Sequence, residues 1–327
     1  MKDEKIATHW RRNAGFFIAG QFLSLFGSML VSYAVMWYIT ITEQSGMMMA
    51  LFTCAAMLPT VFISPFAGVW ADRYNCKHLI NLSDAAIAVI TLMAALFYSA
   101  GSHGILILLA AAMARSIGQG IQQPAVNALI PQIVPDEHLQ KFNSINSTAQ
   151  SLTMFAAPLT ANALIFYFPL KSIFFIDVAT AAIGIATVFF CVKVLPREKK
   201  KERTGGAKAY YQEMMAGLRF INGQPWLKTL FISAALFAVL ASPVMTLTSL
   251  QVARNFGGDY WRLLTVELAF SVGMMGGGVL IAVWGGFKNK VHTMLLSWLL
   301  FGIATFLFGL ITDFYVYIGV MAFCGVT

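Results

Sequence analysis

The chain has 327 residues, of which 58% are hydrophobic and only 11% are charged. A soluble domain carries about 25% charged residues, so one soluble core of this length and hydrophobicity is excluded. The net charge of +8 comes from clusters between apolar segments, and the densest, Lys193 to Lys208, contains no aromatic residue. This distribution argues against a nucleic-acid partner and indicates an integral membrane protein.

Nine apolar segments are long enough to cross a bilayer, because about 20 helical residues span the roughly 30 Å hydrocarbon core. They are expected at Ala14–Thr40, Met47–Ala71, Leu79–Ser99, Ile105–Gln122, Ile145–Phe166, Ser172–Val194, Leu227–Leu250, Leu263–Val283 and Val291–Ile311. A tenth begins at Phe314, and from there to Thr327 a helix would rise only about 21 Å. The predicted fold class is therefore an all-α integral membrane bundle of nine complete spanning helices and a partial tenth.

Alternate loops differ in positive charge. With the N-terminus in the cytoplasm, 18 Lys and Arg residues lie on the cytoplasmic side and three on the outer side, namely Lys171, Arg254 and Arg262. Cytoplasmic loops of membrane proteins are enriched in these residues. The bias predicts a multi-pass protein of the inner (plasma) membrane with a cytoplasmic N-terminus.

A long polar stretch divides the apolar segments into two sets. Residues 1–194 are predicted to form a six-helix N-terminal half, residues 195–226 a cytoplasmic linker, and residues 227–327 an incomplete C-terminal half. Met214, Leu218 and Ile221 in the linker have helical spacing, which predicts an amphipathic helix on the membrane or against the bundle. A solvated linker helix fits this spacing equally well.

A short charged turn joins the second and third segments, and it contains Gly68, Asp72, Arg73 and Lys77. The spacing G-x-x-x-D-R-x-x-x-K resembles the signature of the major facilitator superfamily, which lies between helices 2 and 3 of its members. The resemblance implies a gating role, in which the turn locks two repeated halves together in the outward-facing state. A generic positively charged cytoplasmic turn is the alternative interpretation.

The turn departs from the family pattern at two positions. Asn75 stands where glycine is usual, and Cys76 stands where a basic residue is usual. Asparagine tolerates left-handed backbone better than most residues, so the turn is expected to keep its shape. The missing positive charge would weaken an electrostatic latch.

Other stretches resemble one branch of the superfamily, the macrolide-efflux and related multidrug exporters. They include Gly20-Gln21 in the first segment, the expected loop Pro124–Pro135 after the fourth, and Ile176-Asp177 in the sixth. In the fourth segment, Arg115 followed by Gln119-Gly120 resembles the second motif of the superfamily, with the glutamine displaced by one position. We therefore expect a member of this branch that is C-terminally truncated.

Four ionisable residues lie inside the predicted segments: Asp84, Arg115, Asp177 and Glu267. An unpaired arginine at the membrane midplane costs at least about 2.5 kcal/mol. Asp84 and Arg115 lie about 8 and 10 Å from the cytoplasmic ends of their predicted segments, so they are expected to form an ion pair. Arg115 could serve coupling, structure or both.

Asp177 and Glu267 are candidates for proton-coupling groups, because burial of a carboxylate in the membrane favours its protonated form. Either could instead be an interfacial residue that hydrogen-bonds a loop. Two polar stripes are candidates for the lining of a substrate cavity, with packing between helices as the alternative. They consist of Gln21, Ser24, Ser28 and Ser32 in the first segment and of Asn143, Asn146 and Gln150 in the fifth.

No enzyme, metal site or cofactor is predicted. The four cysteines (Cys54, Cys76, Cys191 and Cys324) form no C-x-x-C pair, and the sequence has no phosphate-binding loop or H-E-x-x-H motif. The family resemblance then implies a secondary active transporter, energised by the proton gradient, that exports lipophilic drugs such as macrolides. Its expected partners are a small lipophilic substrate, protons and the bilayer, and it is expected to be a monomer.

Other functions remain open from the sequence. The same fold could export a siderophore or a lysolipid. Alternatively, the chain could be a membrane sensor that does not transport, or an incomplete fragment.

Overall fold

The computed structural model describes the chain except for residues 1, 99–101, 195–214, 216–218 and 288–289. The regular structure of the described residues is helical. In the N-terminal part the helices are α1 (Lys2–Glu43), α2 (Gly46–Arg73), α3 (Cys76–Phe97), α4 (Ser102–Ile133), η1 (Asp136–His138), α5 (Leu139–Tyr167), α6 (Leu170–Ala186) and η2 (Thr187–Cys191). In the C-terminal part they are α8 (Pro225–Asn255), α9 (Tyr260–Trp284), α10 (Lys290–Phe308) and α11 (Phe314–Val326).

The predicted fold class is confirmed. Within the described residues, nine helices are long and apolar enough to cross a membrane. The last helix, α11, is apolar but has only 13 residues. Most of the predicted linker, including the amphipathic helix near Met214 and Leu218 and most of the Lys193–Lys208 cluster, lies outside the described residues.

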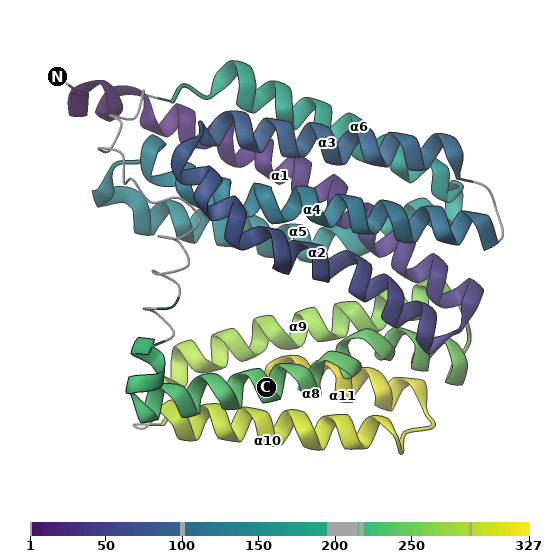
Figure 1. Cartoon of the computed structure of the whole chain (residues 1–327). Coiled ribbons are helices and arrows are strands. Elements are labelled where there is room, and N and C mark those ends of the chain that lie inside the picture. Colours follow the sequence, from purple (N-terminus) through teal and green to yellow (C-terminus); the bar gives the residue numbers. More distant parts are fainter. Residues whose placement is uncertain (1, 99–101, 195–214, 216–218, 288–289) are drawn as a thin grey trace.

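The helices form two groups (Figure 1). Helices α1–α6 make up one group and α8–α11 the other, and the groups approach each other most closely near the α1–α2 and α8–α9 turns. There the Nε atom of Arg254 donates a hydrogen bond of 3.1 Å to the carbonyl oxygen of Gln44. Toward the end that carries the N-terminus, the two groups diverge.

Small residues allow close packing inside the first group. A Cβ atom placed on Gly184 of α6 would lie 2.7 Å from the carbonyl oxygen of Gly20 on α1. On Gly120 of α4 it would lie 3.1 Å from the Cα atom of Thr60 on α2. Since lipid gives little hydrophobic drive for helix association, such backbone contacts do much to hold spanning helices together.

Helix α4 is longer than the sequence predicted. The fourth segment was expected to end at Gln122 and to be followed by a loop from Pro124 to Pro135, but α4 continues to Ile133 with Pro124 and Pro131 inside it. Spanning helices tolerate proline where neighbouring helices satisfy the freed backbone groups. As a result, Arg115 lies about 27 Å from the Ile133 end of the helix instead of about 10 Å from the predicted end.

The orientation remains a prediction, and impermeant thiol labelling of intact cells can test it. Cysteine is placed at Asp259 or at Glu137, two exposed positions at opposite ends of the spans, in a variant without the native cysteines. The positive-inside bias predicts labelling of Asp259→Cys and protection of Glu137→Cys until the membrane is permeabilised. The reverse pattern would invert the assignment.

Packing of α1 on α6 should tolerate no side chain at Gly184. We expect Gly184→Ala to lower the unfolding free energy by about 1–3 kcal/mol, because the added methyl group overpacks the contact with Gly20. Gly302→Ala in α10 is the matched control, since a Cβ atom there meets nothing within 4 Å. Thermal unfolding of both purified variants measures the difference, and equal stability would show that α1 can shift away from α6 at little cost.

Candidate functional site

A cavity of about 570 Å³ lies where the two helix groups meet. Its walls are rich in methionine and aromatic side chains, including Met29, Met36, Phe52, Met154, Phe174, Met245, Phe270 and Met321. Polar groups are fewer, and they include Ser32, Tyr33, Thr91, Arg115, Gln119, Thr248 and Glu267. Flexible thioethers and aromatic rings suit apolar ligands of variable shape, and sparse polar groups can orient them.

Glu267 is the carboxylate among the described residues that line this cavity. It lies about 10 Å along α9 from Tyr260. The hydroxyl group of Tyr33 on α1 donates a hydrogen bond of 2.9 Å to Glu267 Oε1. This bond joins the two helix groups inside the cavity.

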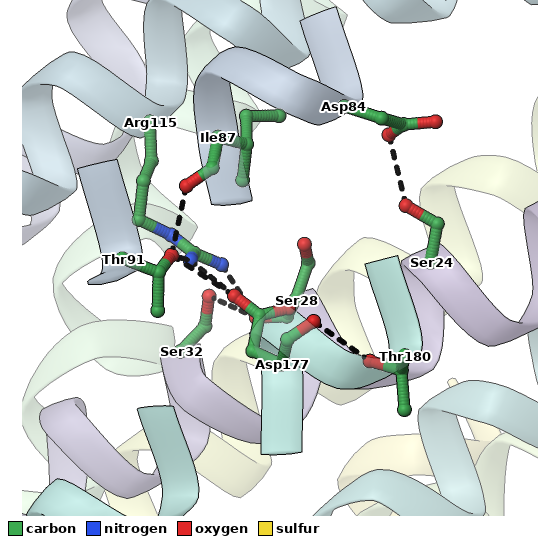
Figure 2. A network of polar contacts seen from close by, with 9 residues as sticks. All are labelled: Ser24, Ser28, Ser32, Asp84, Ile87, Thr91, Arg115, Asp177 and Thr180. Carbon is green, nitrogen blue, oxygen red and sulfur yellow. Dashed lines mark hydrogen bonds and ion pairs between the residues drawn. The ribbon is translucent and has the colours of Figure 1, made fainter. Parts of the chain in front are cut away.

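Arg115 forms an ion pair with Asp177, not with Asp84. Its Nη1 atom lies 2.5 Å from Asp177 Oδ2 and also donates to the Thr91 hydroxyl group. Thr91 donates to the same carboxylate oxygen at 3.0 Å, and Arg115 Nη2 reaches the carbonyl oxygen of Ser28 at 3.4 Å. Figure 2 shows these groups converging from α1, α3, α4 and α6. Arg115 is 5% exposed and Asp177 is fully buried.

The predicted pair between Asp84 and Arg115 is wrong because of the length of α4. Asp84 lies about 12 Å from the Cys76 end of α3, whereas Arg115 lies about 27 Å from the matching end of α4. Thr91, about 22 Å along α3, is the α3 residue beside the guanidinium group. Asp84 is 2% exposed and accepts hydrogen bonds from Ser24 Oγ at 2.8 Å and Gln122 Nε2 at 2.6 Å.

The polar stripe of α1 does not line the cavity as a whole. Ser32 lies in the cavity wall, but Ser24 contacts Asp84 and Ser28 contacts Arg115 within the first helix group. The reason is geometric, because Met29, Tyr33 and Met36 occupy the cavity-facing side of α1 at helical spacing, and Ser24 and Ser28 lie on a different side.

The other residues predicted for the cavity also lie elsewhere. Gln21, Asn146 and Gln150 are not among the lining residues of the cavity. The side-chain nitrogen of Gln21 is buried and has no hydrogen-bond partner among the described residues. The same holds for both side-chain polar atoms of Asn81. The predicted lining is therefore corrected to the methionine-rich and aromatic surface described above.

The charged turn after α2 is held by its neighbours in the same helix group. Asn75 is the N-cap of α3, where its side chain accepts a 3.0 Å hydrogen bond from the Lys77 backbone. Its φ is −71°, so the tolerance of asparagine for left-handed backbone is not used here. Lys77 Nζ donates to the carbonyl oxygens of Phe189 and Val192, both at 2.7 Å, and so satisfies the end of η2.

The gating role of the turn stays a prediction. Gly68 lies in the last turns of α2, where a Cβ atom would meet nothing within 4 Å. Asp72 and Arg73 end the helix and are exposed. Cys76, where the family has a basic residue, is buried, and its Sγ donates to the carbonyl oxygen of Ala71 at 3.2 Å.

Sequence reasoning missed two residues that the structure places at the centre. Tyr33 holds Glu267, and Thr91 joins the Arg115–Asp177 pair. Helical spacing puts the hydroxyl-bearing side chain of Tyr33 on the same side of α1 as Met29 and Met36, and this pattern could have identified it from the sequence. Thr91 carries no comparable signal, since its role depends on which helix lies beside it.

Residues 17–327 match the family model of the Major Facilitator Superfamily. The chain belongs to this superfamily. Macrolide efflux protein A of Streptococcus pyogenes is 26% identical over 315 residues, which cover 94% of this chain and 76% of that protein. Its similarity supports the macrolide-efflux branch that the sequence motifs indicated.

Solved structures of transporters share the fold. A bacterial homologue of the human lysosomal transporter Spinster, inward-facing and unoccupied, has a TM-score of 0.64 and 15% identity, covering 98% of this chain and 73% of that one. A D-xylose–proton symporter has a TM-score of 0.68 and 13% identity, covering 96% and 78% respectively. At these identities the likeness concerns the fold alone.

Charge reversal can test the buried pair. Removing either partner, as in Asp177→Asn or Arg115→Ala, should lower the unfolding free energy by about 3–5 kcal/mol, because the other charge stays buried without its partner. The exchange Arg115→Asp/Asp177→Arg should recover part of this loss. The exchange Asp84→Arg/Arg115→Asp should recover none of the lost stability. If it did, Asp84 and not Asp177 would be the partner of Arg115, as the sequence suggested. Thermal unfolding in detergent gives all four values.

Proposed function

We propose that this superfamily transporter exports a lipophilic cationic drug, of which macrolides are the first class to test, in exchange for protons. The observation that carries the proposal is the cavity between the helix groups, with its methionine and aromatic walls and the carboxylate of Glu267. Such a surface accepts bulky apolar molecules without a demanding shape, while one carboxylate selects for positive charge. The similarity to a macrolide efflux protein supports the same substrate class.

Glu267 is the proposed coupling group. A carboxyl group can hold a proton or, when ionised, attract a cation, but it cannot do both at once. Drug and proton would therefore compete for Glu267, and alternate occupancy on the two sides of the membrane gives exchange. Tyr33 keeps the carboxyl group directed into the cavity through its 2.9 Å hydrogen bond.

The position of the Tyr33–Glu267 bond favours a link between binding and motion. Transporters of this kind move one half against the other around a midplane site. Because Tyr33 belongs to α1 and Glu267 to α9, such a motion must alter their hydrogen bond. A proton or a cation at Glu267 would then favour one arrangement of the halves over the other.

The Arg115–Asp177 pair has a different proposed role. Asp177 is fully buried and accepts from two donors on other helices, so the pair is suited to holding α3, α4 and α6 together. Arg115 nevertheless forms part of the cavity wall. Because Asp177 compensates this positive charge, Glu267 is the carboxylate left to attract a cation among the described residues that line the cavity.

Proton release on drug binding tests the coupling. In weakly buffered detergent, binding of a macrolide or a lipophilic cationic dye should release protons from the purified chain. Glu267→Gln should abolish this release and weaken cation binding by about 10- to 100-fold, since a hydrogen-bonded charge contributes roughly 1.5–3 kcal/mol. Glu137→Gln, which removes an exposed carboxylate in η1, is the control and should behave as the unmodified protein.

The same variants can be compared in vesicles with an imposed pH gradient. Drug accumulation that follows the gradient in the unmodified protein and Glu137→Gln, but not in Glu267→Gln, would support export. Unchanged proton release in Glu267→Gln would refute its coupling role. Absence of any drug binding by the unmodified protein would refute the substrate class.

A further inference from the structure

A second hollow lies outside the central cavity, between α1 and the η1–α5 segment. Its volume is about 650 Å³. One end is formed by Trp10, Arg11, His138 and Lys141, and the walls further along are apolar. We call this hollow the α1–α5 groove, and its lining also includes Ala14, Gly15, Ile18, Ala19, Phe22, Phe142, Ile145, Ala149 and Leu152.

Positive charge is concentrated at one end of the groove. Arg11 and Lys141 are both exposed there, and neither forms an ion pair with a carboxylate of the described residues. The Arg11 guanidinium group lies 5.7 Å from the centre of the Trp10 ring, and this ring stacks on His138 with centroids 4.6 Å apart. The end is therefore a built structure of stacked rings with two cations that no carboxylate of the described residues pairs.

The apolar part of the groove continues into the membrane. From Ala14, the first apolar residue past the charged end, to Phe22 the helix rises about 12 Å, which is less than half of the roughly 30 Å hydrocarbon core. Phe22 and Ile18 of α1 face Ile145 and Leu152 of α5 along this length. A free inorganic anion would contact only the charged end and would leave these walls uncovered.

We propose that the α1–α5 groove binds an anionic phospholipid of the cytoplasmic leaflet. The phosphate group lies between Arg11 and Lys141, and one acyl chain follows the walls toward Phe22. The charge supports this choice of occupant, because the groove opens at the end of the molecule predicted to face the anionic cytoplasmic leaflet. Basic pockets between spanning helices on this side are suited to lipid head groups, and indole rings are typical of the membrane interface.

Head-group selectivity is the first test. The purified chain in detergent is titrated with phosphatidylglycerol and with phosphatidylcholine of the same acyl chains, and bound lipid is counted by native mass spectrometry. We expect preferential retention of phosphatidylglycerol, reduced about fivefold for each cation removed, and thus about 25-fold in Arg11→Ala/Lys141→Ala. Arg12→Ala/Lys228→Ala is the matched control, because it removes two exposed cations near the same membrane surface but outside the groove.

The acyl-chain part of the proposal has its own variant. A Cβ atom on Gly15 would meet nothing within 4 Å, so Gly15→Phe should fill the groove without disturbing its charges or the fold. It is expected to abolish retention of phosphatidylglycerol but to leave binding of inorganic phosphate, measured separately, unchanged. Gly276→Phe in α9, another open glycine, is the control.

Three outcomes would overturn the proposal. Equal retention of the two lipids by the unmodified protein would show that the head-group charge does not matter. Equal losses of phosphatidylglycerol in the groove and control variants would show that the lipid does not bind in the groove. If Gly15→Phe weakens macrolide binding and leaves lipid retention intact, the groove belongs to a drug pathway instead. Because lipid counting requires no transport, these results are independent of whether the export proposal holds.

Discussion

The N-terminal helix group is organised around one buried ion pair, Arg115 with Asp177. A lone arginine at this depth opposes membrane insertion by about 2.5–3.5 kcal/mol, and a lone carboxylate adds a similar cost. Each group removes much of the other's cost only if α4 and α6 stay in register with α3 between them. The glycines of α1 complete the constraint, since a Cβ atom on Gly27 would lie 2.8 Å from Asp177 Oδ1.

The connection between the two helix groups is of another kind. Near the α1–α2 and α8–α9 turns, Arg254 reaches the backbone of Gln44, and inside the cavity Tyr33 reaches Glu267. Arg254 donates through both Nε and Nη2 and Tyr33 through its hydroxyl group, and each such bond has a net contribution of about 0.5–3 kcal/mol. Apolar packing also joins the groups, since one buried cluster contains Leu30 and Phe174 of the first group and Leu250 and Val266 of the second. Such packing and a few hydrogen bonds can be exchanged when one half moves against the other.

The sequence predicted the larger features because they follow from length and charge. Nine apolar segments and the charged turn at Asp72–Lys77 are visible without knowing any neighbour, and they were enough for the fold and the family. Pairings were harder to predict. The partner of Arg115 depends on how far α4 continues past Pro124, and a proline in a spanning helix does not reveal from the sequence whether the helix ends there.

Side-chain direction was a second source of error. The serines of α1 have the spacing of a cavity-lining stripe, and the same spacing fits a stripe that packs against α3 and α6. The rotation of α1 about its axis decides whether the serines face the cavity or the neighbouring helices. Gly20, in contact with Gly184, helps to fix that rotation. The role of Asn75 as a helix cap depends in the same way on local geometry, because the chain enters α3 directly with extended backbone at this residue.

The buried pair also has a consequence for biosynthesis. Arg115 and Asp177 are separated by 62 positions in the chain, so α4 leaves the ribosome well before α6. At 5–20 residues per second, the guanidinium group waits about 3–12 s for its carboxylate. During that interval α4 is stable only where water or the translocation channel solvates Arg115. Release of the first helices into lipid is therefore expected to wait for α6, so that the N-terminal helix group enters the bilayer as one unit.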